Sequence, residues 1–171
     1  VSLLADNYEG RKFNSPNDVV ERSDGSIWFT DPDYGILMDY EGRRAPSEIG
    51  ACHVYRIDPA DGAVTRVADD YAKPNGIGFS PDETFLYVAD TGRTHDPDGP
   101  AHIRRHRVTA DGTGLNGGRL AAHQLHGEGT NDEGAQETGG QGDGAAAGSG
   151  RDAAGHGRNS LNRASVWKKL V

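Results

Sequence analysis

Two asparagines stand at matching points of the chain, and each could offer an amide oxygen to a metal ion. Asn17 lies in the sequence SPND and Asn75 lies in the sequence KPNG. Hard cations such as calcium take oxygen ligands, including Asn carbonyl oxygens, from separate chain segments. The proline before each asparagine restricts the local backbone and helps to aim the side chain. The alternative is that both are turn asparagines whose side chains bond their own backbone.

Each asparagine precedes a hairpin pattern. After Asn17 come Val19 and Val20, a Ser-Asp-Gly turn and the run IWF, and after Asn75 come IGF, a Ser-Pro-Asp turn and the run FLYV. Short apolar runs between turn residues predict antiparallel strands. No segment shows the apolar spacing of an amphipathic helix, so the predicted class is all-β. Asp31 and Asp90 end matching strands, where we expect them to cap turns.

These hairpins belong to a repeat of about 58 residues. The segments SPNDVV and DGSIWFTD align with KPNGIG and DETFLYVAD, and upstream VSLLADNY aligns with VTRVADDY. A third copy is predicted to begin at Ala101 and to fade after Leu120. Units of about four short strands are typical of β-propeller blades, so the chain would hold two to three blades. Because equivalent positions of adjacent blades face a common axis, one cation could contact both Asn17 and Asn75.

Composition divides the chain and limits its partners. Between His126 and Ser160 there is no Val, Ile, Leu, Met, Phe, Trp or Tyr, which predicts a partial propeller over 1–125, a disordered Gly-rich segment over 126–160 and a short tail over 161–171. The net charge of −8 argues against nucleic acid and anionic membranes as partners. No apolar run is long enough to cross a bilayer. A single cysteine and no visible secretory signal predict a cytoplasmic location.

On these motifs the sequence resembles the SMP-30/gluconolactonase/LRE family, which includes the regucalcin-like proteins. The carrying residues are SPNDVV, DGSIWFTDP with the following YG, and KPNG through YVADTG, and the loop with DYEG and EIG is similar to the bacterial gluconolactonase branch. The resemblance implies a six-bladed propeller, a divalent cation, usually calcium, in the central channel, and hydrolysis of a small-molecule lactone. The chain resembles a partial copy of such a protein.

The resemblance also assigns roles to individual residues. It makes Asn17 and Asn75 metal ligands, and it makes Asp18 a candidate ligand of a second metal. Ser15 stands where regucalcin-like members have a substrate-binding Arg, which marks it as a candidate substrate-binding residue and favours substrates of the bacterial gluconolactonase type. The family's remaining ligands come from a Glu-Gly-Pro motif and from a Pro-Asp-Gly blade expected after Leu120. The chain contains no Glu-Gly-Pro, and no Pro-Asp-Gly follows Leu120. No catalytic residue is therefore assigned.

Two functions remain open at this stage. The first is a calcium-dependent lactonase, in which the metal polarises the ester carbonyl and an activated water attacks it. The second is a catalytically inactive propeller remnant that self-associates through open sheet edges and acts as an interaction module. His95, His102 and His106 fit no zinc motif, and their stretch is interpreted as a solvated loop between strands.

Overall fold

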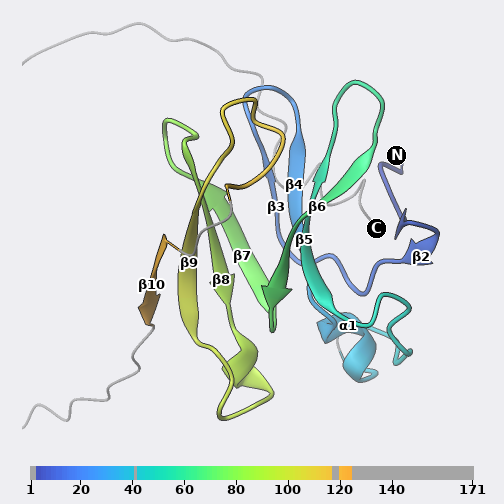
Figure 1. Ribbon diagram of the computed structural model, residues 1–171. Helices are drawn as coiled ribbons and strands as arrows, with labels where there is room; N and C mark the ends of the chain where they lie inside the picture. The colour runs from blue at the N-terminus through green and yellow to red at the C-terminus, as the bar shows by residue number, and fades with distance from the viewer. Residues whose placement is uncertain (1–2, 41, 117–119, 125–171) are drawn as a thin grey trace, which may run out of the picture. The chain divides into compact units, whose positions relative to one another are not determined.

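The computed structural model describes residues 3–40, 42–116 and 120–124, which form short antiparallel strands with little helix (Figure 1). The first four-stranded sheet has the order β3-β4-β5-β6, the second has the order β10-β9-β8-β7, and β1 and β2 form a separate hairpin. The all-β prediction is confirmed. The elements are β1 (Asn7–Tyr8), β2 (Arg11–Lys12), β3 (Val19–Glu21), β4 (Ile27–Asp31), α1 (Tyr34–Leu37), β5 (Cys52–Ile57), β6 (Val64–Tyr71), β7 (Pro74–Phe79), β8 (Phe85–Asp90), η1 (Gly92–Thr94), β9 (His102–Arg107) and β10 (Leu120–Gln124).

Each four-stranded sheet is a meander in which consecutive strands pair, as expected of a propeller blade. The predicted hairpins correspond to β3–β4 and β7–β8, which are antiparallel pairs. The prediction that a third copy begins at Ala101 is wrong. That segment leads into β9, the third strand of the second sheet, and its sequence is similar to that of β5 because β5 is the third strand of the first.

A hydrophobic core lies between the two sheets. Trp28 on β4 and Val54 on β5 are fully buried against residues of the second sheet, and Trp28 meets Phe79 edge-on with ring centroids 5.4 Å apart. The burial of these apolar side chains is the main contribution to holding the sheets together. The buried members of this core are Trp28, Val54, Tyr71, Ile77, Leu86, Val88 and Val108.

The opposite face of the first sheet is also covered. Phe29 and Tyr55 follow Trp28 and Val54 directly, so the alternation of side chains along a strand turns them to this other face. Phe13 packs on both, with ring centroids 5.1 Å away from each. The segment before β3 therefore shields this face, and the two buried faces explain why β5 is buried along its whole length.

The upstream sequence match does not produce matching structure. VTRVADDY forms the eight-residue strand β6, whereas the described part of VSLLADNY contributes only β1. β6 has β5 as a partner, whereas β1 pairs only with the short β2. Partner strands, more than the local sequence, decide this difference.

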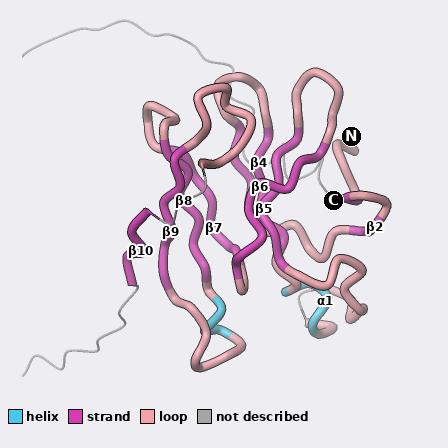
Figure 2. The backbone as a smooth tube through the Cα atoms, viewed as in Figure 1, coloured by secondary structure: helices cyan, strands magenta, loops and turns pink. Residues whose placement is uncertain are grey.

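Residues 125–171 lie outside the described part of the chain, and with them the predicted Gly-rich segment over 126–160 and the tail over 161–171. In the residues that are described, no helix has the length and apolar character needed to cross a membrane. Figure 2 shows the two short helical turns, α1 and η1, at the same end of the two sheets.

Candidate functional site

The backbone leading into each first strand is held by the aspartate that ends the second strand. The carboxylate of Asp31 accepts hydrogen bonds from the backbone N–H groups of Asn14 at 2.9 Å and Ser15 at 2.8 Å. The carboxylate of Asp90 accepts the equivalent bonds from Ala72 at 3.0 Å and Lys73 at 2.9 Å. Both aspartates are buried. Asp90 also accepts the Gly92 N–H at 3.3 Å, as expected of a turn cap, whereas the bonds of Asp31 go to the upstream segment and not to the turn after it, so the turn-cap prediction is wrong for Asp31. The same pair of backbone hydrogen bonds to a buried aspartate therefore holds the segment before Asn17 and the segment before Asn75.

Asp31 is fully buried, and burial raises the pKa of its carboxyl group to about 7. The two backbone N–H donors act in the opposite direction because they stabilise the charged form, while the negative charge of Asp33 adds to the increase of the pKa. The cost of removing the charge from water is the largest of these effects.

Asn17 and Asn75 line the same cavity, of ≈ 290 Å³. Its walls come from the segment before β3, from β7 and from the segments that follow β4 and β8. The lining residues are Asn17, Tyr34, Met38, Tyr40, Asn75, Thr94 and His95. The structure thus brings together the two asparagines that the repeat had matched across the sequence.

The two amide groups differ in what holds them. The side chain of Asn17 has no hydrogen bond to any described residue, and only its backbone N–H is bonded, to the Thr30 carbonyl oxygen at 2.8 Å. The Nδ2 of Asn75 donates to the Thr91 Oγ1 at 3.3 Å. The carbonyl oxygens of both side chains are left available to a ligand in the cavity.

Asp18 does not line this cavity. One of its carboxylate oxygens accepts the Val19 backbone N–H at 2.9 Å, and the other accepts the Ile77 N–H at 3.0 Å. Since Val19 and Ile77 are equivalent in the repeat, one side chain bonds the same backbone group in two sheets. Its predicted role at a second metal remains a prediction.

Ser15 also lies outside the cavity lining. Its hydroxyl donates to the Pro32 carbonyl oxygen at 2.6 Å and accepts the Gly35 N–H at 2.9 Å. These bonds fix the start of α1, where a Cβ on Gly35 would come within 2.8 Å of the Ser15 Cβ. Its predicted contact with substrate remains a prediction.

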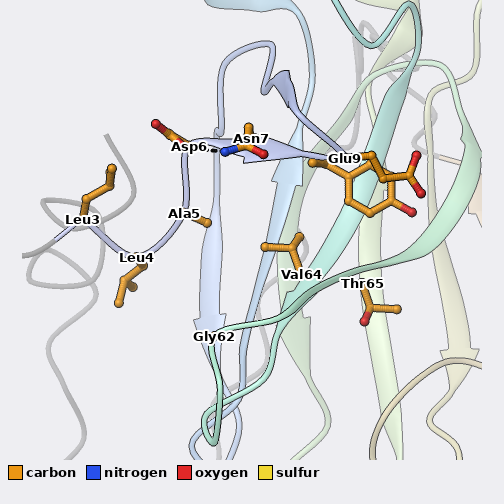
Figure 3. A pocket seen from close by; sticks show the side chains of 10 residues that line it. Leu3, Leu4, Ala5, Asp6, Asn7, Glu9, Gly62, Val64 and Thr65 are labelled. Carbon is orange, nitrogen blue, oxygen red and sulfur yellow. Dashed lines mark hydrogen bonds between the residues drawn. The ribbon is translucent and has the colours of Figure 1, made fainter.

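A larger hollow, of ≈ 630 Å³, lies at the N-terminal segment between residues 3–9 and the start of β6 (Figure 3). Asn7 and Asp6 in its lining bond each other, with the Asn7 Nδ2 donating to Asp6 Oδ1 at 2.7 Å. Its lining includes residues of the matched segments VSLLADNY and VTRVADDY, but no two of them occupy equivalent positions of the repeat. The smaller cavity is the candidate site, because Asn17 and Asn75 occupy equivalent positions of the repeat and both line it.

Comparison with known proteins identifies the family. The sequence pattern of the SMP-30/Gluconolactonase/LRE-like region matches residues 1–149. The chain belongs to this family. The match confirms the resemblance seen in the motifs around Asn17 and Asn75.

Among family members, the chain is similar to named lactone hydrolases. It is 40% identical over 93 residues to a gluconolactonase of Zymomonas mobilis, covering 54% of this chain and 25% of that protein. It is 44% identical over 89 residues to the lactonohydrolase oryL of Aspergillus oryzae, covering 52% and 20%. A solved gluconolactonase structure from Xanthomonas campestris superposes with a TM-score of 0.60 at 38% identity, over 67% of this chain and 36% of that one.

The chain spans only a quarter of the Zymomonas relative and about a third of the Xanthomonas structure. This coverage fits a partial copy of the family, and the two four-stranded sheets agree with its propeller architecture. The whole relatives therefore contain residues that have no counterpart in this chain.

The family implies a divalent cation, and the donor chemistry of the cavity fits one. Asn17 and Asn75 provide amide oxygens, the ligand type that calcium accepts. Both ligands are neutral, and no carboxylate is among the described residues that line the cavity. Within the described residues no group of three or more His, Cys, Asp or Glu side chains is placed to hold a metal. The cavity thus offers two neutral amide oxygens and, among its described lining residues, no negative charge.

Two ring-bearing residues of the cavity, Tyr34 and His95, are not predicted by the sequence motifs. Tyr34 and His95 pack together with ring centroids 5.3 Å apart, and both line the cavity. His95 is exposed in a loop, as predicted, but His102 and His106 lie on β9, so the loop prediction is wrong for them. The Tyr-Gly after Asp33 was noted only as a family motif. The repeat gives no signal for this pair, because Tyr34 follows Asp31 by three residues and His95 follows Asp90 by five.

Proposed function

We propose that this chain is part of a metal-dependent lactonase that hydrolyses a sugar-type lactone to its hydroxy acid. The observation that supports this most directly is the convergence of Asn17 and Asn75 in one cavity. The similar proteins named gluconolactonase and lactonohydrolase support the reaction class. Calcium is the cation we expect, because both ligands are amide oxygens.

The reaction adds one water across the ring ester. The water oxygen bonds to the carbonyl carbon, the ring C–O bond breaks, and the former ring oxygen takes a proton and becomes a hydroxyl group. At neutral pH the new carboxylic acid releases its proton. A bound cation would supply polarisation of the carbonyl oxygen. In this proposal, the residues of this chain present the amide oxygens of Asn17 and Asn75 to the same cavity, where the cation would bind.

Two neutral amides supply no charge to oppose that of a divalent cation. We therefore expect this chain alone to bind calcium weakly, with the tighter site requiring carboxylates such as those of the family's Glu-Gly-Pro and Pro-Asp-Gly motifs. The lactone is the expected partner, and the net charge of −8 still argues against nucleic acid and anionic membranes. The cytoplasm remains the expected compartment.

Calcium titration by calorimetry tests the metal site. Residues 1–171 should bind calcium, and Asn17→Ala and Asn75→Ala should each abolish the heat. Asn116→Ala is the matched control, because Asn116 is exposed and lies outside the cavity lining. Equal heats in all four proteins would contradict the assignment. Hydrolysis of gluconolactone, followed by acid release with and without a chelator, then tests the reaction.

The second candidate, an inactive module that associates through sheet edges, depends on the edge strands. β6 is one edge of the first sheet and exposes Arg66, Asp69 and Asp70. Exposed charges on an edge strand discourage pairing with another sheet. Heterogeneous oligomers on size exclusion, with no calcium binding, would favour this second function over the lactonase.

A further inference from the structure

A chain of hydrogen bonds leads from the first sheet's loop to the amide group of Asn75. The hydroxyl groups of Tyr34 and Thr91 are 2.5 Å apart, and Asn75 Nδ2 donates to Thr91 Oγ1 at 3.3 Å. Thr91 Oγ1 also donates to the Lys73 carbonyl oxygen at 3.4 Å. The Thr91 oxygen accepts from Asn75 Nδ2, and the Thr91 hydroxyl shares a short hydrogen bond with the Tyr34 hydroxyl in which either group can be the donor.

This arrangement determines which end of the Asn75 amide faces the cavity. An amide group is planar, so a bond that holds Nδ2 also sets the direction of Oδ1. Thr91 takes the donor end, and the acceptor end remains for a cation. Without the Thr91 bond the amide could rotate and present N–H groups, which repel a cation.

Tyr34 is itself held in place. Lys73 forms an ion pair with Asp33 and lies 6.0 Å from the centre of the Tyr34 ring. His95 packs on the same ring. Tyr34 opens α1, which follows the first sheet's second strand, whereas Asn75 and Thr91 belong to the second sheet and its loop. The hydroxyl contact therefore ties the Asn75 side chain to the neighbouring sheet.

Asn17 has no equivalent support. The repeat that matches Asp31 with Asp90 matches Pro32 with Thr91, and proline has no hydroxyl group. The side chain of Asn17 accordingly makes no hydrogen bond with any residue in the described ranges. The two candidate ligands thus differ, since one is oriented in advance and the other is not.

We propose that Tyr34 is a positioning residue, which acts through Thr91 to direct the carbonyl oxygen of Asn75 into the cavity. This inference rests on the proposed role of Asn75 as a ligand of the metal in the lactonase. Such residues around metal ligands commonly change metal affinity by about 10–100-fold when they are replaced. We expect the lower end of that range, because Asn75 is partly exposed and water can replace part of the lost bond.

The test uses nuclear magnetic resonance of the Asn75 side-chain NH₂ group in residues 1–171, together with calcium titration. Thr91→Val removes the Thr91 hydroxyl at nearly constant shape, and Tyr34→Phe removes the Tyr34 hydroxyl. Thr91→Ser is the conservative control, because serine keeps a hydroxyl at this position. Thr91→Val and Tyr34→Phe should shift the Asn75 NH₂ signals and leave those of Asn17 in place. Thr91→Ser should restore both the signals and the calcium affinity.

The two readouts separate the inference from the proposed function. If the unaltered chain binds no calcium, the metal site fails, while the NH₂ signals still report whether Tyr34 and Thr91 orient Asn75. Unchanged Asn75 signals in both Thr91→Val and Tyr34→Phe would overturn the inference. It would also be overturned if the signals shifted while calcium affinity stayed equal in a chain that binds calcium.

Discussion

The first and second sheets are copies of one repeat, yet they use their matching positions differently. Both hold the backbone before the first strand with a buried aspartate, Asp31 or Asp90. Beyond this shared device, the first sheet sends polar side chains into the second. Asp18 accepts the Ile77 N–H, and Thr30 Oγ1 donates to the backbone carbonyl oxygen of Asn75 at 2.7 Å. The second sheet has Gly76 and Ala89 at the corresponding positions, which cannot make such bonds.

The reason for this difference is the edge of the second sheet. β3 and β7 are both edge strands, but of the two only the outer side of β7 faces another sheet among the described residues. Backbone N–H and C=O groups that lose water must be paired. Side chains of Asp18 and Thr30 provide partners in place of a strand. The repeat thus keeps the aspartate that holds each sheet's own backbone, Asp31 or Asp90. The positions that differ between the copies, Asp18 and Thr30, make the hydrogen bonds between the sheets.

Removal of the shared aspartate should have the largest effect and should test whether the two copies depend on it equally. Asp31→Ala leaves two backbone N–H groups without their acceptor, and Asp90→Ala leaves three, those of Ala72, Lys73 and Gly92. Each variant should lose about 3 kcal/mol in free energy of unfolding, since an unpaired buried donor costs about 1–3 kcal/mol. Urea unfolding measures this. A large loss for one variant and none for the other would show that the copies are not equivalent.

Replacement of the bridging side chain should have the next largest effect. Asp18→Ala removes the acceptor of Val19 and Ile77 at once, and we expect a loss of about 2 kcal/mol in free energy of unfolding. Hydrogen exchange of the Ile77 amide, which lies in the second sheet, should accelerate together with that of Val19 in the first. Protection that persists at Ile77 would contradict the bridge between sheets.

The pH dependence at Asp31 should be the smallest effect. Its pKa of about 7 in the folded chain exceeds the ordinary 3.8, so the folded state binds the proton more tightly than the unfolded state. Stability from this group is complete at low pH and is lost as the pH rises through about 7. Between pH 6 and 8 the loss should be about 1 kcal/mol.

Asp31→Asn isolates this contribution, because it carries no titrating group at that position. Burial lowers the pKa of His53 and His106, and these groups change stability in the opposite direction over an overlapping range. The difference between the unaltered chain and Asp31→Asn cancels their effect. A difference in free energy of unfolding that is constant from pH 6 to 8 would contradict the raised pKa of Asp31.

Much of the fold could be predicted from the sequence because its signals are local. Ser, Asp, Gly and Pro predict the turns between β3 and β4 and between β7 and β8. The alternation of apolar residues predicts the strands on either side of these turns. The error at Ala101 arose because similarity between third strands was interpreted as the start of a new unit. Sequence similarity identifies equivalent strands, but strand pairing decides to which sheet each one belongs.

The candidate site was predicted in part. Asn17 and Asn75 were found because they occupy equivalent positions in a repeat, and equivalent positions in adjacent sheets converge. Tyr34 and His95 were missed as members of the cavity because they lie in loops of different sequence and length. The residues next to a loop side chain in the sequence do not predict which side chain of another sheet it contacts in the folded chain.

The amino-acid sequence by itself determined the strands, the turns, the repeat and the family, since each follows from residue types at short or regular spacing. Only the tertiary structure decided that Asp18 bonds both sheets, that Asp31 is buried deeply enough to raise its pKa, and that Tyr34 reaches Thr91. These features depend on the docking of one sheet against the next, which brings together groups about 60 residues apart and excludes water from them.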